Sequence, residues 1–220
     1  GDWRENYPDY LGSCNSLDTN VGRLVDTLES YGIKDNTIIF YTCDHGSHFR
    51  TRNAEYKRSC HDASIRIPLI AWGGPFQGGN VVKDLVSLID VPPTLLDCAG
   101  IEIPAQYQGN SMVRLAKGGN ENWPKSIFAQ ISEAETGRTV RTSDWKYCVK
   151  APEFKPDEPY SDIYEEEYLY DLYADPHERH NLVSDPAYAK VRTEMAELLL
   201  GYMKKAQEPE AKIIPCTQME

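Results

Sequence analysis

The chain has 220 residues, of which 40% are hydrophobic and 10% aromatic, which suits a packed core and excludes a disordered protein. Its formal net charge of −11 disfavours non-specific nucleic-acid binding, which depends on Lys and Arg neutralising phosphates. No apolar run approaches the roughly 20 residues that a membrane helix needs. We therefore expect neither a nucleic acid nor a membrane as partner. Six scattered cysteines without a Cys-x-x-Cys pair argue against a zinc ribbon.

The first 100 residues alternate helical and strand patterns. Apolar residues at helical spacing predict a helix over 17–28, with Gly32 beyond its C-terminal end. Continuous β-branched and aromatic runs at 37–43 and 65–72 predict strands buried on both faces. Asp90, followed by two early prolines, predicts the start of a short helix. This alternation without hairpin turns indicates an α/β fold with a parallel sheet.

The pattern changes after a glycine-containing linker at 117–120. The two-residue gap Ser143-Asp144 between two strand patterns predicts a hairpin. Apolar residues spaced along 191–202 predict a final amphipathic helix. We therefore expect a small antiparallel sheet with one helix packed on it, and two domains, 1–125 and 126–220. The expected strands of the second domain are 127–131, 138–142, 145–149 and 168–172.

The strongest local feature is Cys43-Asp44-His45-Gly46, directly after the first predicted strand. Ligands of open α/β sheets bind beyond the carboxyl ends of the strands. A carboxylate and an imidazole on one tight turn suit a single metal ion, and the alternative is an Asp that caps the next turn. The following segment, 48–66, carries five basic and two acidic side chains within an acidic protein. This local reversal of charge indicates an anion site, with a solvated charged face as the alternative.

Taken together, these segments resemble the C-terminal portion of the sulfatase family, within the alkaline-phosphatase-like superfamily. The resemblance implies the second half of an alkaline-phosphatase-like parallel sheet with helices, followed by a small antiparallel sheet and a C-terminal helix. Residues 1–125 would be the C-terminal half of the catalytic α/β domain, and 126–220 an α+β subdomain. The similar stretches are 17–24, 35–40, 44–46, 64–70, 86–101, 141–147, 169–176 and 178–182, together with Lys57.

The resemblance implies a sulfuric ester hydrolase. In the family, a formylglycine hydrate attacks sulfur while a divalent cation and basic residues neutralise the sulfate oxygens. Carried over by position, Asp44 and His45 would be metal ligands and Lys57 would contact the sulfate. His61 would line the pocket or protonate the leaving group, with a packed histidine as the alternative. Further candidates for binding anionic parts of the substrate are His48, Arg50 and Arg52.

The expected cation is calcium, because sulfatases usually bind it and it prefers oxygen ligands. The nitrogen of His45 suits zinc or manganese better, so these two metals stay open as alternatives. The substrate class is equally open between sulfated carbohydrates, aryl sulfates and other small sulfate esters. The arginines near the expected site favour a polyanionic carbohydrate. By family analogy, we expect the enzyme to be secreted, periplasmic or lysosomal.

One departure from the family limits this interpretation. The nucleophile motif, Cys or Ser followed by x-Pro-x-Arg, begins at none of the six cysteines and at no serine. The pair of Asp ligands that precedes it in the family is missing too. We therefore expect this chain to be a C-terminal portion whose partner is the N-terminal half of the same enzyme, with the formylglycine in that half. Alone, the chain should be inactive and should associate through exposed apolar surface.

Two other functions stay open from the sequence. A two-metal phosphohydrolase or phosphodiesterase of the same superfamily also ends a strand in Asp-His-Gly. It would need a further histidine ligand, and His48 or His61 would have to provide it. The other alternative is a catalytically inert binding chain that has kept the fold without the nucleophile.

Overall fold

The computed structural model describes residues 1–216, and these divide into two compact units. The first unit contains Gly1–Tyr56 and Ile67–Trp123, and the second contains Lys57–Arg66 and Pro124–Glu220. The expected domains, 1–125 and 126–220, stay a prediction about the family's organisation. No helix within residues 1–216 combines the length and the apolar character needed to cross a membrane.

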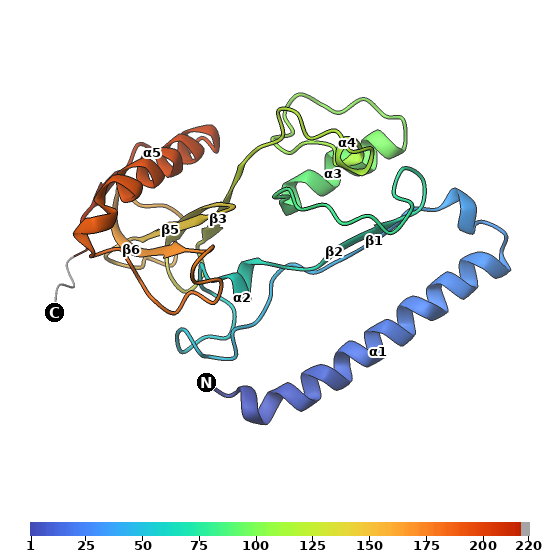
Figure 1. Cartoon of the computed structure of the whole chain (residues 1–220), viewed down its shortest axis with the longest axis horizontal. Helices are drawn as coiled ribbons and strands as arrows, with labels where there is room; N and C mark the ends of the chain where they lie inside the picture. Colours follow the sequence, from blue (N-terminus) through green and yellow to red (C-terminus); the bar gives the residue numbers. More distant parts are fainter. Residues whose placement is uncertain (217–220) are drawn as a thin grey trace. The chain divides into compact units, whose positions relative to one another are not determined.

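The first unit begins with a long helix and a two-stranded sheet (Figure 1). Helix α1, Trp3–Ser30, is longer than predicted and is followed by Gly32, whose φ of 67° suits a glycine after a helix end. The short helix η1, Lys34–Asn36, leads into strand β1, Ile39–Thr42, which pairs with β2, Leu69–Trp72.

The structure of β1 and β2 corrects two expectations. Neither strand is buried on both faces, because the residues of β1 are only partly buried and Ile70 of β2 is 62% exposed. The two strands are antiparallel, whereas the sequence analysis predicts a parallel sheet here. A parallel pair needs a long crossover, usually a helix. The connection from residue 43 to residue 68 contains one four-residue helix, α2, Asp62–Ile65, and β2 returns beside β1 in the opposite direction.

The rest of the first unit is built around short helices and a small core. These are η2, Leu88–Asp90, α3, Val91–Cys98, and α4, Val113–Ala116. The predicted helix start at Asp90 is confirmed, with prolines in the first turn of α3. The Asp90 carboxylate accepts hydrogen bonds from the backbone N–H groups of Ser87 at 2.8 Å and Asn110 at 2.7 Å. A buried cluster then forms from Met112, Leu115 and Trp123.

The second unit contains a five-stranded mixed sheet in the order β3-β4-β5-β6-β7. All neighbours are antiparallel except β6 and β7, which are parallel. The predicted hairpin at residues 143–144 is confirmed, because β4 pairs directly with β5. The strands are β3, Ser126–Ile131, β4, Gly137–Thr142, β5, Trp145–Lys150, β6, Ile163–Asp171, and β7, Lys212–Ile214.

Helix α5, Ala189–Lys205, lies along one face of this sheet and follows the short helix η3, Pro186–Tyr188 (Figure 1). The predicted final helix is thereby confirmed. Val140, Tyr147 and Leu169 face the helix, because directly opposed residues of neighbouring strands share a face. They form the main core of this unit with Met195, Leu199 and Met203 of α5.

Candidate functional site

The Asp44–His45 pair lies directly beyond β1, where the sequence predicts a metal site. The hydroxyl of Thr42, at the end of β1, donates to the carbonyl of Pro68 at 2.9 Å and ties this strand end to the start of β2. Asp44 is 81% exposed and His45 33% exposed in their side chains. Both side chains are therefore accessible at the strand end, as a binding site requires.

The hydrogen bonds of His45 determine which ring nitrogen is available. Its Nδ1 lies 2.9 Å from the carbonyl oxygen of Gly46, which can only accept, so Nδ1 carries the proton. In the neutral ring this bond leaves the lone pair on Nε2, which lies 3.5 Å from Oδ2 of Asp44. The other carboxylate oxygen accepts the backbone N–H of His45 at 3.0 Å, which fixes the carboxylate beside the ring.

This arrangement fits two neighbouring ligands of one cation. Metal–ligand bonds of about 2.1–2.5 Å place adjacent ligands of one ion about 3–3.5 Å apart. The His45–Asp44 separation matches this spacing, and the donor set is one nitrogen and one oxygen. Within residues 1–216, no group of three or more His, Cys, Asp or Glu side chains is arranged to hold a metal ion.

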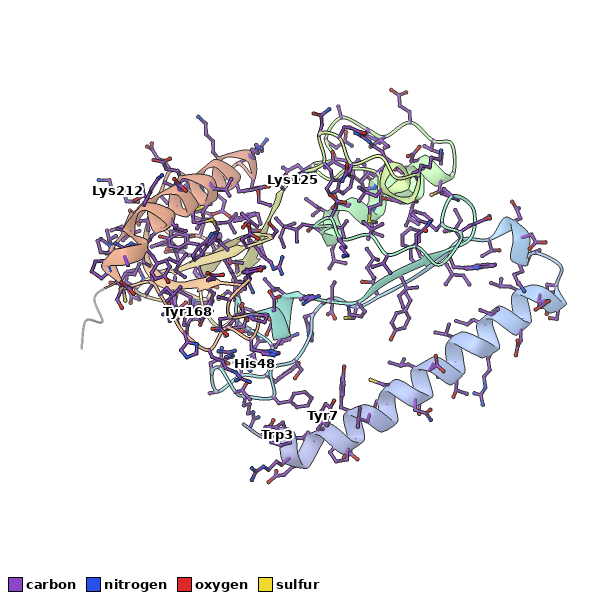
Figure 2. The ribbon with its side chains drawn as sticks, in the orientation of Figure 1. Trp3, Tyr7, His48, Lys125, Tyr168 and Lys212 are labelled. Carbon is purple, nitrogen blue, oxygen red and sulfur yellow. The ribbon has the colours of Figure 1, made fainter. Side chains whose placement is uncertain are left out.

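His48, a predicted substrate contact that is labelled in Figure 2, is buried. Its backbone N–H donates to the carbonyl of Tyr56 at 2.8 Å, and the whole residue is only 2% exposed. Neither ring nitrogen has a hydrogen-bond partner among the described residues. Burial lowers the pKa of the imidazole, so the ring is neutral at neutral pH. A direct contact between His48 and an anion would need the surrounding loop to move.

The predicted contact Arg50 projects from a constrained loop. Phe49 and Arg50 have φ values of 49° and 55°, a left-handed conformation that non-glycine residues rarely adopt. The Arg50 side chain is 59% exposed, and its Nε lies 3.6 Å from a carboxylate oxygen of Asp2. The second arginine of the loop, Arg52, is partly buried. Arg50 and Arg52 thus place two guanidinium groups on the same short loop, as a surface that binds anions requires.

Lys57 and His61, the predicted catalytic pair, belong to the second unit, whereas the other five predicted residues belong to the first. His61 is buried against the sheet, with ring nitrogens 3.1 Å from the Ser59 hydroxyl and 3.0 Å from the Tyr170 hydroxyl. Its ring centroid lies 4.9 Å from that of Tyr168, which is labelled in Figure 2. These contacts fix the orientation of the ring within the second unit.

A buried group of charged side chains next to His61 is missed by the sequence analysis. Lys146 forms ion pairs with Asp62 and Glu178, and Arg141 contacts the same Asp62 carboxylate at 3.3 Å. We call these four residues the ion cluster. The sequence carries no signal for this cluster, because Lys146 alternates with Trp145 and Tyr147 as a solvent-facing residue of a half-buried strand does.

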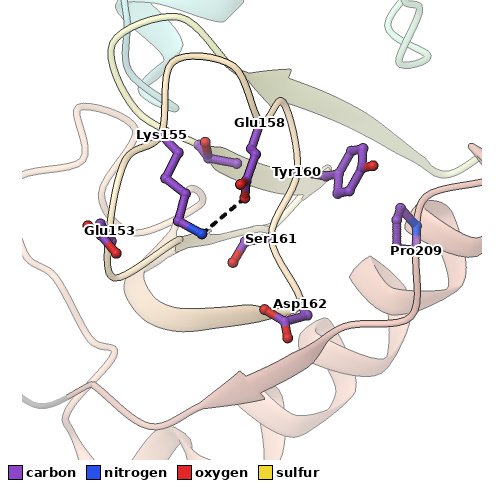
Figure 3. Close-up of a pocket in the computed structure, with 8 residues that line it drawn as sticks. Glu153, Lys155, Glu158, Tyr160, Ser161, Asp162 and Pro209 are labelled. Atoms are coloured by element: carbon purple, nitrogen blue, oxygen red, sulfur yellow. Dashed lines mark hydrogen bonds and ion pairs between the residues drawn. The ribbon is translucent and has the colours of Figure 1, made fainter.

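A cavity of 330 Å³ lies elsewhere in the second unit (Figure 3). Lys155 and Glu158 form an ion pair of 3.1 Å across it. None of the predicted site residues lines this cavity. The lining residues are Thr136, Glu153, Lys155, Glu158, Tyr160, Ser161, Asp162 and Pro209.

Comparisons with known protein families and relatives agree with the resemblance. The family described as "Sulfatase" matches residues 2–101, and "N-sulphoglucosamine sulphohydrolase, C-terminal" matches residues 54–205. An N-acetylglucosamine-6-O-sulfatase of Bacteroides thetaiotaomicron is 32% identical over 210 residues, which is 93% of this chain and 37% of that protein. The chain thus spans less than half the length of this relative.

Solved structures support the same assignment. One, titled as a complex with its substrate D-glucosamine-2-N,6-O-disulfate, has a TM-score of 0.77 and 30% identity over 90% of this chain and 40% of that one. A phosphonate monoester hydrolase of Silicibacter pomeroyi has a TM-score of 0.75 and 25% identity over 89% of this chain and 40% of that one. The predicted fold class is thereby confirmed. Because the N-sulphoglucosamine sulphohydrolase C-terminal family matches more than half of the residues, this chain belongs to the sulfatase family.

Proposed function

We propose that this chain is the C-terminal part of a sulfatase that removes a sulfate ester from a sulfated glucosamine-type carbohydrate. The observation that carries the proposal is the accessible Asp44–His45 pair, held beyond β1 with His45 Nε2 3.5 Å from Asp44 Oδ2. The substrate class is supported by the relatives, because one is named an N-acetylglucosamine-6-O-sulfatase and a similar structure is titled with a disulfated glucosamine.

In the mechanism that we propose, each residue of this chain has a defined task. The Asp44 carboxylate and His45 Nε2 would hold a divalent cation, calcium before zinc or manganese, whose charge stabilises negative charge on the sulfate oxygens. The Lys57 ammonium would neutralise a further sulfate oxygen, because a compact cation needs no planar geometry to do so. Arg50 and Arg52 would bind other anionic groups of the sugar. The formylglycine nucleophile would come from the N-terminal region of the enzyme.

For His61, the observed contacts support a positioning role more than proton transfer. Both ring nitrogens face hydroxyl groups of the same unit, Ser59 and Tyr170, so neither is directed toward a leaving group in this arrangement. A catalytic role for His61 stays a prediction that the assay below tests. Export of the enzyme from the cytosol stays a prediction as well.

A second candidate function is hydrolysis of a phosphonate or phosphate ester. It is favoured by the similarity to a phosphonate monoester hydrolase with a TM-score of 0.75. Sulfate and phosphonate esters both place negative oxygens on a tetrahedral centre, so the same cation and Lys57 would serve either. A comparison of substrates therefore has to distinguish the two candidates.

The test uses the full-length protein that contains this chain, with glucosamine 6-sulfate, 4-nitrophenyl sulfate and 4-nitrophenyl phenylphosphonate as substrates. We expect the highest kcat/KM with the sulfated sugar, and a loss of about 10²-fold or more in Asp44→Asn and Lys57→Ala. Asp35→Asn, on η1 near the opposite end of β1, is the control and should keep its activity. Calcium-dependent thermal stabilisation, absent in Asp44→Asn, would report binding independently of turnover.

Three outcomes would contradict the proposal. Preference for the phosphonate would favour the second candidate function, and full activity in Asp44→Asn would remove this carboxylate from the site. Turnover by the present chain alone would overturn the proposal that the nucleophile lies in another region. His61→Gln should lose activity without any change in the acidic or basic limb of the pH profile if the residue only positions its segment.

A further inference from the structure

The second unit's sheet has a polar face, opposite to the face that packs against α5. Arg141 of β4, Lys146 of β5 and Tyr170 of β6 are direct cross-strand partners, so they form one row on this face. Thr139, Cys148 and Tyr168 form the next row. The side chains of this face contact the short segment Lys57–Arg66, which belongs to the same unit although 57 residues separate it from Pro124.

The ion cluster anchors this segment to the sheet. Lys146 is 0% exposed and lies between the carboxylates of Asp62 and Glu178, while Arg141 contacts both oxygens of Asp62 at 3.3 Å. The Asp62 backbone N–H donates to Glu178 Oε2 at 2.8 Å. Burial alone would raise the pKa of Asp62, but Lys146 and Arg141 outweigh burial and hold the pKa below its usual value. Asp62 is therefore ionised in the folded chain at neutral pH.

Glu178 reaches this position through a strained backbone. Its φ of 54° lies in the left-handed region, which costs a residue other than glycine conformational energy. A turn built on Asp175 maintains it, because the Asp175 carbonyl accepts the Glu178 N–H at 3.0 Å. The Asp175 carboxylate accepts the backbone N–H groups of Arg179 and His180 at 2.6 and 2.8 Å. This conformation places a carboxylate between Lys146 and the Asp62 amide.

A second anchor lies one residue before Asp62. The Tyr170 hydroxyl is 3.0 Å from His61 Nε2, and the His61 ring also contacts the ring of Tyr168. The Ser59 hydroxyl bonds both the His61 ring at 3.1 Å and the Ser64 hydroxyl at 3.2 Å. The backbone N–H of Ser59 in turn donates to the carbonyl of Lys57 at 2.8 Å. A continuous series of contacts thus leads from the sheet to Lys57.

From these contacts we propose that Lys146, Glu178 and Tyr170 are positioning residues, which hold the segment Lys57–Arg66 on the sheet and thereby place Lys57 for its anionic substrate. The proposal rests on the proposed function for the role of Lys57. It assigns to the C-terminal sheet a part in sulfate recognition, although none of these three residues touches the substrate. A displacement of about 1 Å in a binding group can lower a rate about 10²-fold.

A double-mutant cycle in the full-length enzyme tests whether the effect passes through Lys57. Lys146→Met should lower kcat/KM for the sulfated sugar about 10²-fold, and Tyr170→Phe, which removes a single hydroxyl, about tenfold. Added to Lys57→Ala, either change should cause little further loss, because the group that they position is already absent. Losses that multiply in the double variants would overturn the proposal. Tyr170→Phe keeps the test decisive if Lys146→Met does not fold.

The matched control is Glu208→Gln, which disrupts another buried ion pair of the same sheet. Glu208 accepts from Arg138 at 2.7 Å, and both side chains are almost fully buried, on the face that carries α5. This variant should lose stability, yet it should keep kcat/KM within about threefold of the unaltered enzyme. A loss of activity equal to that of Lys146→Met would mean that stability alone explains the effect.

Hydrogen exchange in the present chain separates this proposal from the proposed function. In Lys146→Met and Glu178→Gln, amides of the segment Lys57–Arg66 should exchange at least about tenfold faster, while those of β3 change little. Unchanged exchange of the segment would overturn the proposal, whether or not the enzyme hydrolyses sulfate esters. Accelerated exchange together with an inactive full-length enzyme would instead contradict the proposed function and leave the anchoring of the segment established.

Discussion

The two units of this protein use apolar residues in different ways. In the second unit, α5 buries Leu199 completely against the sheet, and the buried core includes residues from three neighbouring strands. In the first unit, α1 is the longest helix of residues 1–216 and has no buried residue at all. Leu24 of α1 is 64% exposed. An amphipathic pattern therefore predicts a helix in both units, but it does not supply the surface against which that helix packs.

The largest expected effect is found by comparing the same substitution, Leu to Ala, in α5 and in α1. Leu199→Ala should lower the free energy of unfolding by about 2–5 kcal/mol, because it opens a cavity in a closed core. Leu24→Ala should change it by less than about 0.5 kcal/mol, because the side chain is already mostly in solvent. Urea unfolding followed by circular dichroism measures both. Equal effects would mean that α1 has a buried face in solution.

The pH dependence of stability tests one carboxyl group of the second unit, that of Glu167. Burial, reinforced by the neighbouring Glu135, raises the pKa of Glu167 to about 7 from its usual 4.5. Between these values the unfolded chain releases the proton and the folded chain retains it, so stability falls as pH rises from 4.5 to 7. The total effect is roughly 3 kcal/mol. In Glu167→Gln this fall should disappear.

The measurement is the urea midpoint of both proteins at pH 5 and pH 8. The Glu194→Gln variant on the exposed side of α5 is a suitable control, since it removes a carboxylate of the same type from the surface. If Glu167→Gln kept the same fall between pH 5 and pH 8, Glu167 would not be its source.

The smallest effect concerns association through α1. Five large side chains of α1 are exposed and recur at spacings of three, four and seven residues. They are Trp3, Tyr7, Tyr10, Leu17 and Leu24. Such a pattern is typical of a helix that packs along one stripe. The Leu17→Glu/Leu24→Glu variant should therefore shift the chain toward the monomer in sedimentation experiments. Thr19→Glu/Ser30→Glu, which adds the same charge away from the stripe, should leave association unchanged. A monomeric unaltered chain would contradict the predicted association.

Much of the local structure follows from the sequence. The hairpin at residues 143–144, the final helix and the helix start at Asp90 are each specified by neighbouring residues, through turn length, periodicity and the early prolines of α3. The position of Asp44 and His45 at a strand end is specified in the same way, because a buried strand pattern stops immediately before them.

The direction of β2 relative to β1 is not specified locally. It depends on the path of residues 43–68, where the chain turns back without a crossover helix. The burial of His48 and the contact between His61 and Tyr170 also depend on residues distant in the sequence, so periodicity gives no signal for them.

The sequence by itself therefore determined the family and much of the order of the elements, and it predicts which residues bind a cation and an anion. Only the tertiary structure decided that Asp62 and Lys146, 84 positions apart, meet in a buried ion cluster with Glu178. The physical reason is that charges are stable in the interior only when a partner of opposite charge is within contact distance. That partner is supplied by the fold, through strands and turns far away in the chain.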